Sequence, residues 1–333
     1  MFSSEPQTAI NNKASPPLFW GSPRHALMML IAATCFWGLS FPLTKYWQVN
    51  TVDCPGGAIL SSLTLLAIRT VPALVVLAIF KPHLFVLADR RALLIGSFLG
   101  SINFLGCFFQ ILGLATTTPT LSGFFTSLAS AWVPLLALVC FRISVAPATL
   151  VGICVGIAGA GVLEIDTSGP LVLGMGEGLS LLCSVMFALV ILLLDRLGRR
   201  VESSHLTVGF VGMTGLPALV LAPLWAQKEE VLGPWMSWLG AVLQTPGLLL
   251  DVALLTLLCT VLAYHWMTTY QPRVPASRAA LVYLIEPLFA ATFSVAWGYD
   301  AITLRLILGG GLILGGNFLV ELPAWLPRYQ KAG

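Results

Sequence analysis

Charged residues are scarce in this sequence, since Asp, Glu, Lys and Arg make up only 9% of its 333 residues while 57% are hydrophobic. The mean hydropathy of +0.91 lies far outside the balance of a water-soluble domain. The net charge of +3 is small and dispersed, unlike the clustered cations of a nucleic-acid-binding surface. The composition therefore excludes a soluble domain and argues against a nucleic-acid partner.

Metal-binding and catalytic motifs are also missing. The four histidines show no HExxH spacing or other catalytic arrangement, and the seven cysteines include no CxxC pair. We therefore expect no metal, no cofactor, no disulfide framework and no enzymatic activity. We also expect no cleavable signal peptide, because the first apolar run lacks a small-residue cleavage site and is followed by nine more.

Long apolar runs are what the sequence has in abundance. A membrane-spanning helix takes about 20 mostly apolar residues. Strands of a membrane barrel would alternate in polarity, and these runs do not. We predict an all-α integral membrane protein with ten transmembrane helices, surrounded by the lipid bilayer. The ten predicted spans are Leu27–Tyr46, Leu60–Phe80, Ala92–Leu112, Leu121–Phe141, Ala146–Leu163, Leu173–Leu194, Leu206–Pro223, Leu248–Thr268, Ala279–Trp297 and Leu304–Glu321.

The distribution of cations predicts the orientation of these spans. Residues 1–24 are rich in Ser, Pro and Asn and are expected to form a flexible tail, and residues 324–333 a second tail. If the amino terminus is cytoplasmic, thirteen of the 17 Lys and Arg residues lie on the cytoplasmic side. Both tails are therefore expected in the cytoplasm. The cations that fall elsewhere are Lys45, Lys228, Arg305 and, inside a span, Arg69.

Two pairs of segments indicate an internal duplication. Thr120–Pro134 (TLSGFFTSLASAWVP) aligns with Arg273–Pro287 (RVPASRAALVYLIEP). Further on, GICVGIAG aligns with GGGLILGG. This second match pairs Gly152 with Gly309 and Gly159 with Gly316. The predicted repeats are residues 25–168 and 169–323, each containing five spans.

An odd number of spans in each repeat requires the second copy to enter the membrane from the opposite side. The charges agree with this inversion. The turn before the fourth span, TTTPT, carries no cation, whereas its counterpart carries Arg273 and Arg278.

The glycine ladders lie inside apolar spans, so we interpret them as packing contacts between helices rather than nucleotide-binding loops. These ladders are Gly152-Gly156-Gly159 and Gly311-Gly315.

Several motifs resemble one family of membrane proteins. They are FWGLSFPLTK (Phe36–Lys45), LAIRTVPAL (Leu66–Leu74), TLSGFFTSL with the VPLL that follows it, RVPASRAALVYLIEPLFA and GGGLILGGNFLVE. Together, and in this order, they resemble the EamA-type members of the drug/metabolite transporter superfamily. The sequence departs from that pattern after the fourth and ninth spans, where CFRIS and WGYDA replace the usual Gly-Glu-Arg-like turn.

The resemblance implies a ten-helix, inverted-repeat carrier that moves a small metabolite by alternating access. Amino acids or related amphipathic compounds, moved outward, are the expected substrates, and protons are a candidate coupling partner. The expected location is the bacterial cytoplasmic (inner) membrane. A multidrug carrier, or a nucleoside or sugar carrier of the same fold, is the alternative, followed by a receptor or scaffold without flux. The sequence leaves the oligomeric state open.

Glu286 and Arg69 are the charged candidates for a substrate site. A carboxylate near the bilayer centre costs about 2.5–3.5 kcal/mol, so it is expected to face protein or a water-filled cavity. Because burial disfavours the charged form of an acid, Glu286 is a candidate proton carrier, with His265 as a second. Pro287 predicts a helix break beside the acid. Arg69 can pair with a buried acid or bind a substrate carboxylate through two parallel hydrogen bonds.

Polar and aromatic residues inside the other spans complete the predicted site. In the first span, Trp37 and Ser40 precede a predicted break at Pro42, and Pro72 predicts another in the second span. Asn103 and Gln110 are two helical turns apart and share a face of the third span. The remaining candidates for the substrate cavity are Phe104, Ser184, Tyr264 and Tyr283.

Overall fold

The computed structural model describes residues 23–80, 89–142, 145–164, 174–198, 201, 203–274, 279 and 282–322. The described residues form helices and turns and contain no strand, which confirms the all-α prediction. The predicted tails lie outside the described residues, except that Pro23 and Arg24 begin the first helix. Arg278, used above to support the inversion, also lies outside them.

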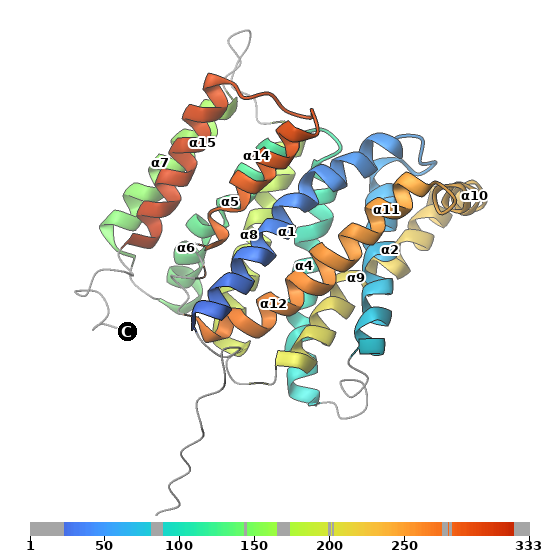
Figure 1. The fold of residues 1–333 in the computed structure, drawn as a ribbon, viewed down its shortest axis with the longest axis horizontal. Helices are drawn as coiled ribbons and strands as arrows, with labels where there is room; N and C mark the ends of the chain where they lie inside the picture. The colour runs from blue at the N-terminus through green and yellow to red at the C-terminus, as the bar shows by residue number, and fades with distance from the viewer. Residues whose placement is uncertain are drawn as a thin grey trace, which may run out of the picture.

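Fifteen helical elements make up the described chain (Figure 1). Those of the first half are α1 (Pro23–Asn50), α2 (Gly57–Phe80), α4 (Arg90–Gly113), α5 (Pro119–Ser127), α6 (Ala129–Phe141) and α7 (Pro147–Glu164). Those of the second half are α8 (Met175–Gly198), α9 (Ser203–Lys228), α10 (Leu232–Val242), α11 (Pro246–Leu254), the π-helix η2 (Leu255–Leu262), α12 (Ala263–Tyr270), the 3₁₀-helix η3 (Gln271–Arg273), α14 (Glu286–Ala296) and α15 (Leu304–Glu321).

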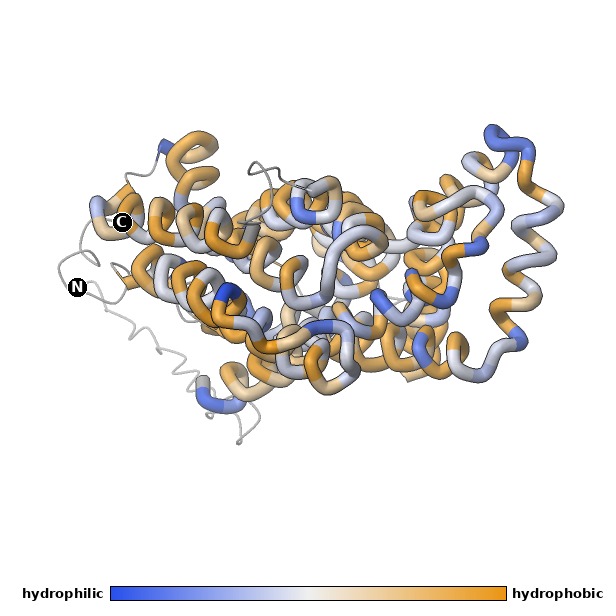
Figure 2. Tube along the Cα trace, turned by 90° about the horizontal axis from the view of Figure 1, so that it is seen from above, coloured by the Kyte–Doolittle hydropathy of each residue, from blue (hydrophilic) through white to orange (hydrophobic). Residues whose placement is uncertain are grey.

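Seven helical stretches of the described chain are long and apolar enough to cross a membrane. They are Arg24–Asn50, Gly57–Phe80, Arg90–Gly113, Pro119–Phe141, Met175–Gly198, His205–Lys228 and Pro246–Arg273. Figure 2 shows hydrophobic residues along most of the helices, with hydrophilic ones gathered mainly near their ends. Three predicted spans, the fifth, ninth and tenth, correspond to shorter apolar helices or include residues outside the described part, so the total of ten stays a prediction.

The breaks expected at Pro42 and Pro72 are absent, because α1 and α2 continue through these residues. Proline leaves the carbonyl four residues earlier without its amide donor, here those of Gly38 and Ile68. In both helices a hydroxyl group bonds the carbonyl next to the freed one. Ser40 Oγ donates to the carbonyl of Trp37 at 2.7 Å. Thr256 Oγ1, on η2, donates to the carbonyl of Arg69 at 3.0 Å. The expected span Leu121–Phe141 is instead divided, since α5 and α6 meet at Leu128.

Glycines bring α7 and α15 into close contact along one edge of the bundle (Figure 1). A Cβ added to Gly152 would lie 2.5 Å from the carbonyl oxygen of Gly316, and one added to Gly159 would lie 2.7 Å from that of Gly309. The predicted contact through Gly311 and Gly315 is wrong, because a Cβ at either position would meet no atom within 4 Å. These two glycines lie on the other face of α15.

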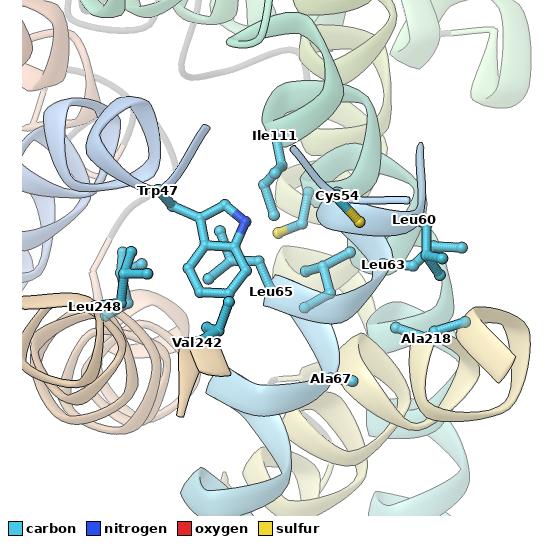
Figure 3. Close-up of a cluster of buried hydrophobic side chains, with 14 of the residues drawn as sticks. Trp47, Cys54, Leu60, Leu63, Leu65, Ala67, Ile111, Ala218, Val242 and Leu248 are labelled. Atoms are coloured by element: carbon cyan, nitrogen blue, oxygen red, sulfur yellow. The ribbon is translucent and has the colours of Figure 1, made fainter. Parts of the chain in front are cut away.

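A core at the opposite side of the bundle includes α10, a helix that the sequence analysis did not predict. Trp47 lies among Leu65, Val242 and Leu248 in this core (Figure 3). Its indole Nε1 donates to Ser61 Oγ at 2.9 Å, so the buried donor is satisfied. This packing fixes α1, α2 and α11 relative to one another and thereby positions the polar residues on their inner faces.

Candidate functional site

A cavity of about 290 Å³ lies between helices of both halves of the chain. Side chains from α1, α2 and α4–α6 line it together with side chains from α8, α12 and the start of α14. Eight of the predicted substrate residues are brought together there: Trp37, Ser40, Arg69, Asn103, Gln110, Tyr264, Tyr283 and Glu286.

Three predicted residues do not line the cavity. Phe104 is buried in the core and stacks on Phe108, with ring centroids 6.2 Å apart. Ser184 is buried, donates to a carbonyl of its own helix and accepts from the indole of Trp132 at 2.9 Å. His265 is half-buried, with its Nδ1 3.4 Å from Thr269 Oγ1. His265 therefore lies outside the cavity that Glu286 lines.

Hydroxyl groups beside the break between α5 and α6 were missed by the sequence analysis. Thr126, Ser127 and Ser130 line the cavity around Leu128, where the two helices meet. A signal for them existed, because the internal duplication aligns this segment with the one that ends at Pro287. A predicted break in one repeat implies a break at the equivalent place in the other.

One wall of the cavity is a hydrogen-bonded cluster. Asn103 Nδ2 donates to the hydroxyl of Tyr264 at 3.0 Å and to Thr214 Oγ1 at 3.1 Å. The Tyr264 hydroxyl also lies 3.3 Å from Cys107 Sγ. The guanidinium of Arg69, which is 4% exposed, interacts with the same hydroxyl, and its Nε has no hydrogen-bond partner among the described residues. Part of the hydrogen-bonding capacity of this arginine is thus unused.

Glu286 faces the cavity from the first turn of α14. Pro287 occupies the same turn, where a proline needs no amide donor, and the preceding residues 284 and 285 form a turn. Gly38 of α1 packs against Phe289 and against the carbonyl of Glu286, which holds α1 close to the start of α14. In the described chain, Glu286 forms no salt bridge with Arg69.

Aromatic rings also line the cavity. The Trp37 ring lies with its centroid 6.1 Å from that of Tyr264 and 5.6 Å from that of Tyr283. The Tyr283 hydroxyl donates to Gln271 Oε1 at 2.8 Å, which fixes its ring. A cavity with an apolar body and a few polar groups suits a small solute that carries both characters.

The polar residues of this cavity lie among apolar helices from both halves of the chain. Residues 174–322 match the EamA-like transporter family. This confirms the expected resemblance for the second half of the chain. Proteins of the EamA-like family are membrane transporters of small solutes and not enzymes. The EamA-like segment contributes Tyr264, Tyr283 and Glu286 to the cavity.

Comparison of folds extends the likeness beyond the EamA-like segment. A solved structure described as "Crystal structure of protein" is similar over 92% of this chain and 99% of its own, with a TM-score of 0.59 and 19% sequence identity. At that identity the likeness shows the fold alone. No curated protein sequence matches the chain.

Proposed function

We propose that the chain is a secondary transporter that works by alternating access between two inverted repeats, residues 25–168 and 169–323. Support comes from α7 and α15. The alignment that pairs Gly152 with Gly309 also pairs Gly159 with Gly316, and it therefore exchanges the two observed contacts between these helices. Two inverted copies packed around a pseudo-two-fold axis have this property. Ten spans with both termini in the cytoplasm, in a bacterial inner membrane, complete the proposal.

The proposed substrate is an amino acid or a related amphipathic zwitterion. The observation that carries this proposal is the presence of Arg69 and Glu286 in one cavity without a salt bridge between them. Arg69 would bind the carboxylate and Glu286 the ammonium group, while Trp37 and Tyr264 would contact the side chain.

The size of the cavity favours this substrate class over the alternative. Ligand pockets usually measure about 300–1,000 Å³. The observed 290 Å³ lies just below that range and suits one amino acid better than a drug-sized or nucleoside-sized solute. A receptor or scaffold would respond to its ligand without net flux, and the transport experiment below distinguishes it from a carrier.

Hydrogen bonds around the α4–α5 turn hold the helices together at one end of the bundle. Lys45 Nζ donates to the carbonyls of Leu114 at 2.9 Å and Thr117 at 2.8 Å. Asp300 accepts from the amide of Thr120 at 3.1 Å. These contacts link α1 and the α14–α15 loop to one turn, which supports a state closed at that end. Under the proposed orientation the closed end is the outer one, so the cavity loads from the cytoplasm for export.

Glu286 is also the proposed proton-coupling residue. An ammonium group and a proton compete for the same carboxylate, so substrate binding at Glu286 would release a proton. Outward movement of substrate would then be exchanged for inward movement of protons. His265 is the second candidate. Uptake driven by a pH gradient across the proteoliposome membrane separates the two. Glu286→Gln should lose the dependence on the gradient, and His265→Gln should keep it.

Counterflow in proteoliposomes tests the function. The panel comprises radiolabelled L-phenylalanine, L-leucine, L-threonine, glucose, uridine and tetraphenylphosphonium. Amino acids are expected to exchange, and Glu286→Gln, Arg69→Ala and Trp37→Ala should each reduce exchange by about tenfold or more. Glu229→Gln, at a solvent-exposed acid, is the matched control and should not. Exchange of the nucleoside or the lipophilic cation alone would refute the proposed substrate class, and no exchange of any compound would refute transport of these classes.

A further inference from the structure

A second intramembrane acid, Asp251, lies outside the cavity lining. It occupies α11, within the apolar stretch Pro246–Arg273, and is 3% exposed. Neither of its carboxylate oxygens has a hydrogen-bond partner among the described residues. A buried acid without partners is costly, so its retention in a membrane helix needs a physical reason.

Arg69 provides the opposite charge beside this acid. Asp251 and Arg69 interact electrostatically across the interface of α11 and α2, but they form no salt bridge in the described chain. The Nε of Arg69 likewise has no hydrogen-bond partner among the described residues. Arg69 therefore lies between the cavity, which it lines, and an acid that does not reach the cavity.

Few other ionisable groups surround Asp251. Cys259 approaches it from η2, and Tyr299 approaches it from the loop after α14. Burial raises the pKa of Tyr299, and the charge of Asp251 raises it further. Tyr46 of α1 lies near Tyr299. Of these groups, only Arg69 carries a positive charge. The short π-helix η2 begins four residues after Asp251, and such distortions recur at functional sites.

We infer that Asp251 is an internal counter-ion of Arg69 and takes up one proton when an anionic group of the substrate binds to the cavity side of that arginine. This inference rests on the proposed function, because it needs a substrate with a carboxylate. The step is a simple protonation, in which a proton from water converts the Asp251 carboxylate to the neutral acid.

The physical basis is competition for one positive charge. While Arg69 is unoccupied, it favours the charged form of Asp251. When a substrate carboxylate neutralises the guanidinium, Asp251 becomes an isolated buried anion, and protonation removes that cost. By linkage, protonation of Asp251 strengthens carboxylate binding by the same factor. This uptake opposes the release of a proton from Glu286, so the number of protons exchanged per substrate equals the release at Glu286 minus the uptake at Asp251.

Carbodiimide labelling of the purified full-length protein tests the pairing without any substrate. The apolar reagent N,N′-dicyclohexylcarbodiimide adds to a protonated carboxyl group and leaves a stable acylurea that peptide mass spectrometry can locate. Labelling of Asp251 should be greater at pH 5.5 than at pH 8.5. Arg69→Gln should increase it about threefold at pH 8.5, and Arg69→Lys, which keeps the charge, should restore the wild-type level. Labelling of Glu286 in the same digest serves as the internal control.

Transport kinetics test the link to substrate. For the amino acid that exchanges in the counterflow assay, the ratio of KM at pH 8.5 to KM at pH 5.5 should be about threefold larger in the wild type than in Asp251→Asn, because only the wild type loses a proton from Asp251 as the pH rises. Asp53→Asn changes an exposed acid outside the spans and should behave as the wild type.

Either of two results would overturn the inference: equal labelling of Asp251 in the wild type and in Arg69→Gln, or a wild-type pH profile of KM in Asp251→Asn. Absence of labelling at Asp251 at pH 5.5, with Glu286 labelled in the same sample, would also overturn it. If no panel compound is transported, the proposed function fails while the labelling result still decides the pairing of Asp251 with Arg69.

Discussion

The contact between α7 and α15 provides a test of the packing, through Gly159→Ala. The new Cβ would lie 2.7 Å from the carbonyl oxygen of Gly309 and 2.7 Å from the amide nitrogen of Ile313. Both are backbone atoms, so a side chain cannot rotate away and the helices must separate. Overpacking of this kind costs about 1–3 kcal/mol. Alanine is favoured over glycine in a helix by about 0.5–1 kcal/mol, which offsets part of that cost.

Gly161→Ala is the matched control on the same helix. A Cβ at this position meets no atom within 4 Å, so only the helix propensity changes. The control should be as stable as the wild type or more stable by about 0.5–1 kcal/mol. The two variants should therefore differ in free energy of unfolding by about 1–3 kcal/mol, because the overpacking cost applies only to Gly159→Ala.

Unfolding in mixed micelles measures this difference. Each purified variant is titrated with sodium dodecyl sulfate in a mild detergent, and tryptophan fluorescence and circular dichroism follow the transition. Coincident curves from the two probes justify a two-state treatment. If Gly159→Ala proves at least as stable as Gly161→Ala, the close approach of α7 and α15 through glycine is incorrect.

Three further predictions concern the cavity wall, a thiol and the topology. Asn103→Ala should lower the free energy of unfolding by about 1–3 kcal/mol, because it removes two buried hydrogen bonds. An unchanged unfolding curve would contradict the role of these hydrogen bonds in the cavity wall. Cys54 lies outside the spans, and burial raises the pKa of its thiol from 9.0 to about 11. Maleimide labelling at pH 7.5 should therefore be roughly a hundredfold slower than in the unfolded chain, and it should accelerate as the pH approaches about 11. Equal labelling rates in the folded and unfolded chains would refute the raised pKa. Impermeant labelling of single cysteines should place Arg142→Cys and Arg273→Cys on one side of the membrane and Gln244→Cys on the other, whereas opposite sides for the first two would end the inverted-repeat proposal.

Much of the candidate site was accessible from the sequence because polar residues inside apolar spans are rare. Glu286 and Arg69 were identified by the cost of charge in lipid, and both line the cavity. The same reasoning applies to Asp251 in LLLDVALLTLL, where it would have identified a second acid. The prediction that Phe104 lines the cavity was wrong for a different reason. An aromatic residue in an apolar span is equally compatible with the core, and only its neighbours decide between core and cavity.

The sequence by itself determined that this chain is helical and belongs in a membrane, because the hydrophobic effect and the need to satisfy backbone groups act on local composition and length. It also indicated which segments are related by duplication. Only the tertiary structure decided that helices continue through Pro42 and Pro72, that α15 packs through Gly309 and Gly316, and which charged groups face one another. Those outcomes depend on distances between helices far apart in sequence, and contacts between helices can override what local propensity favours.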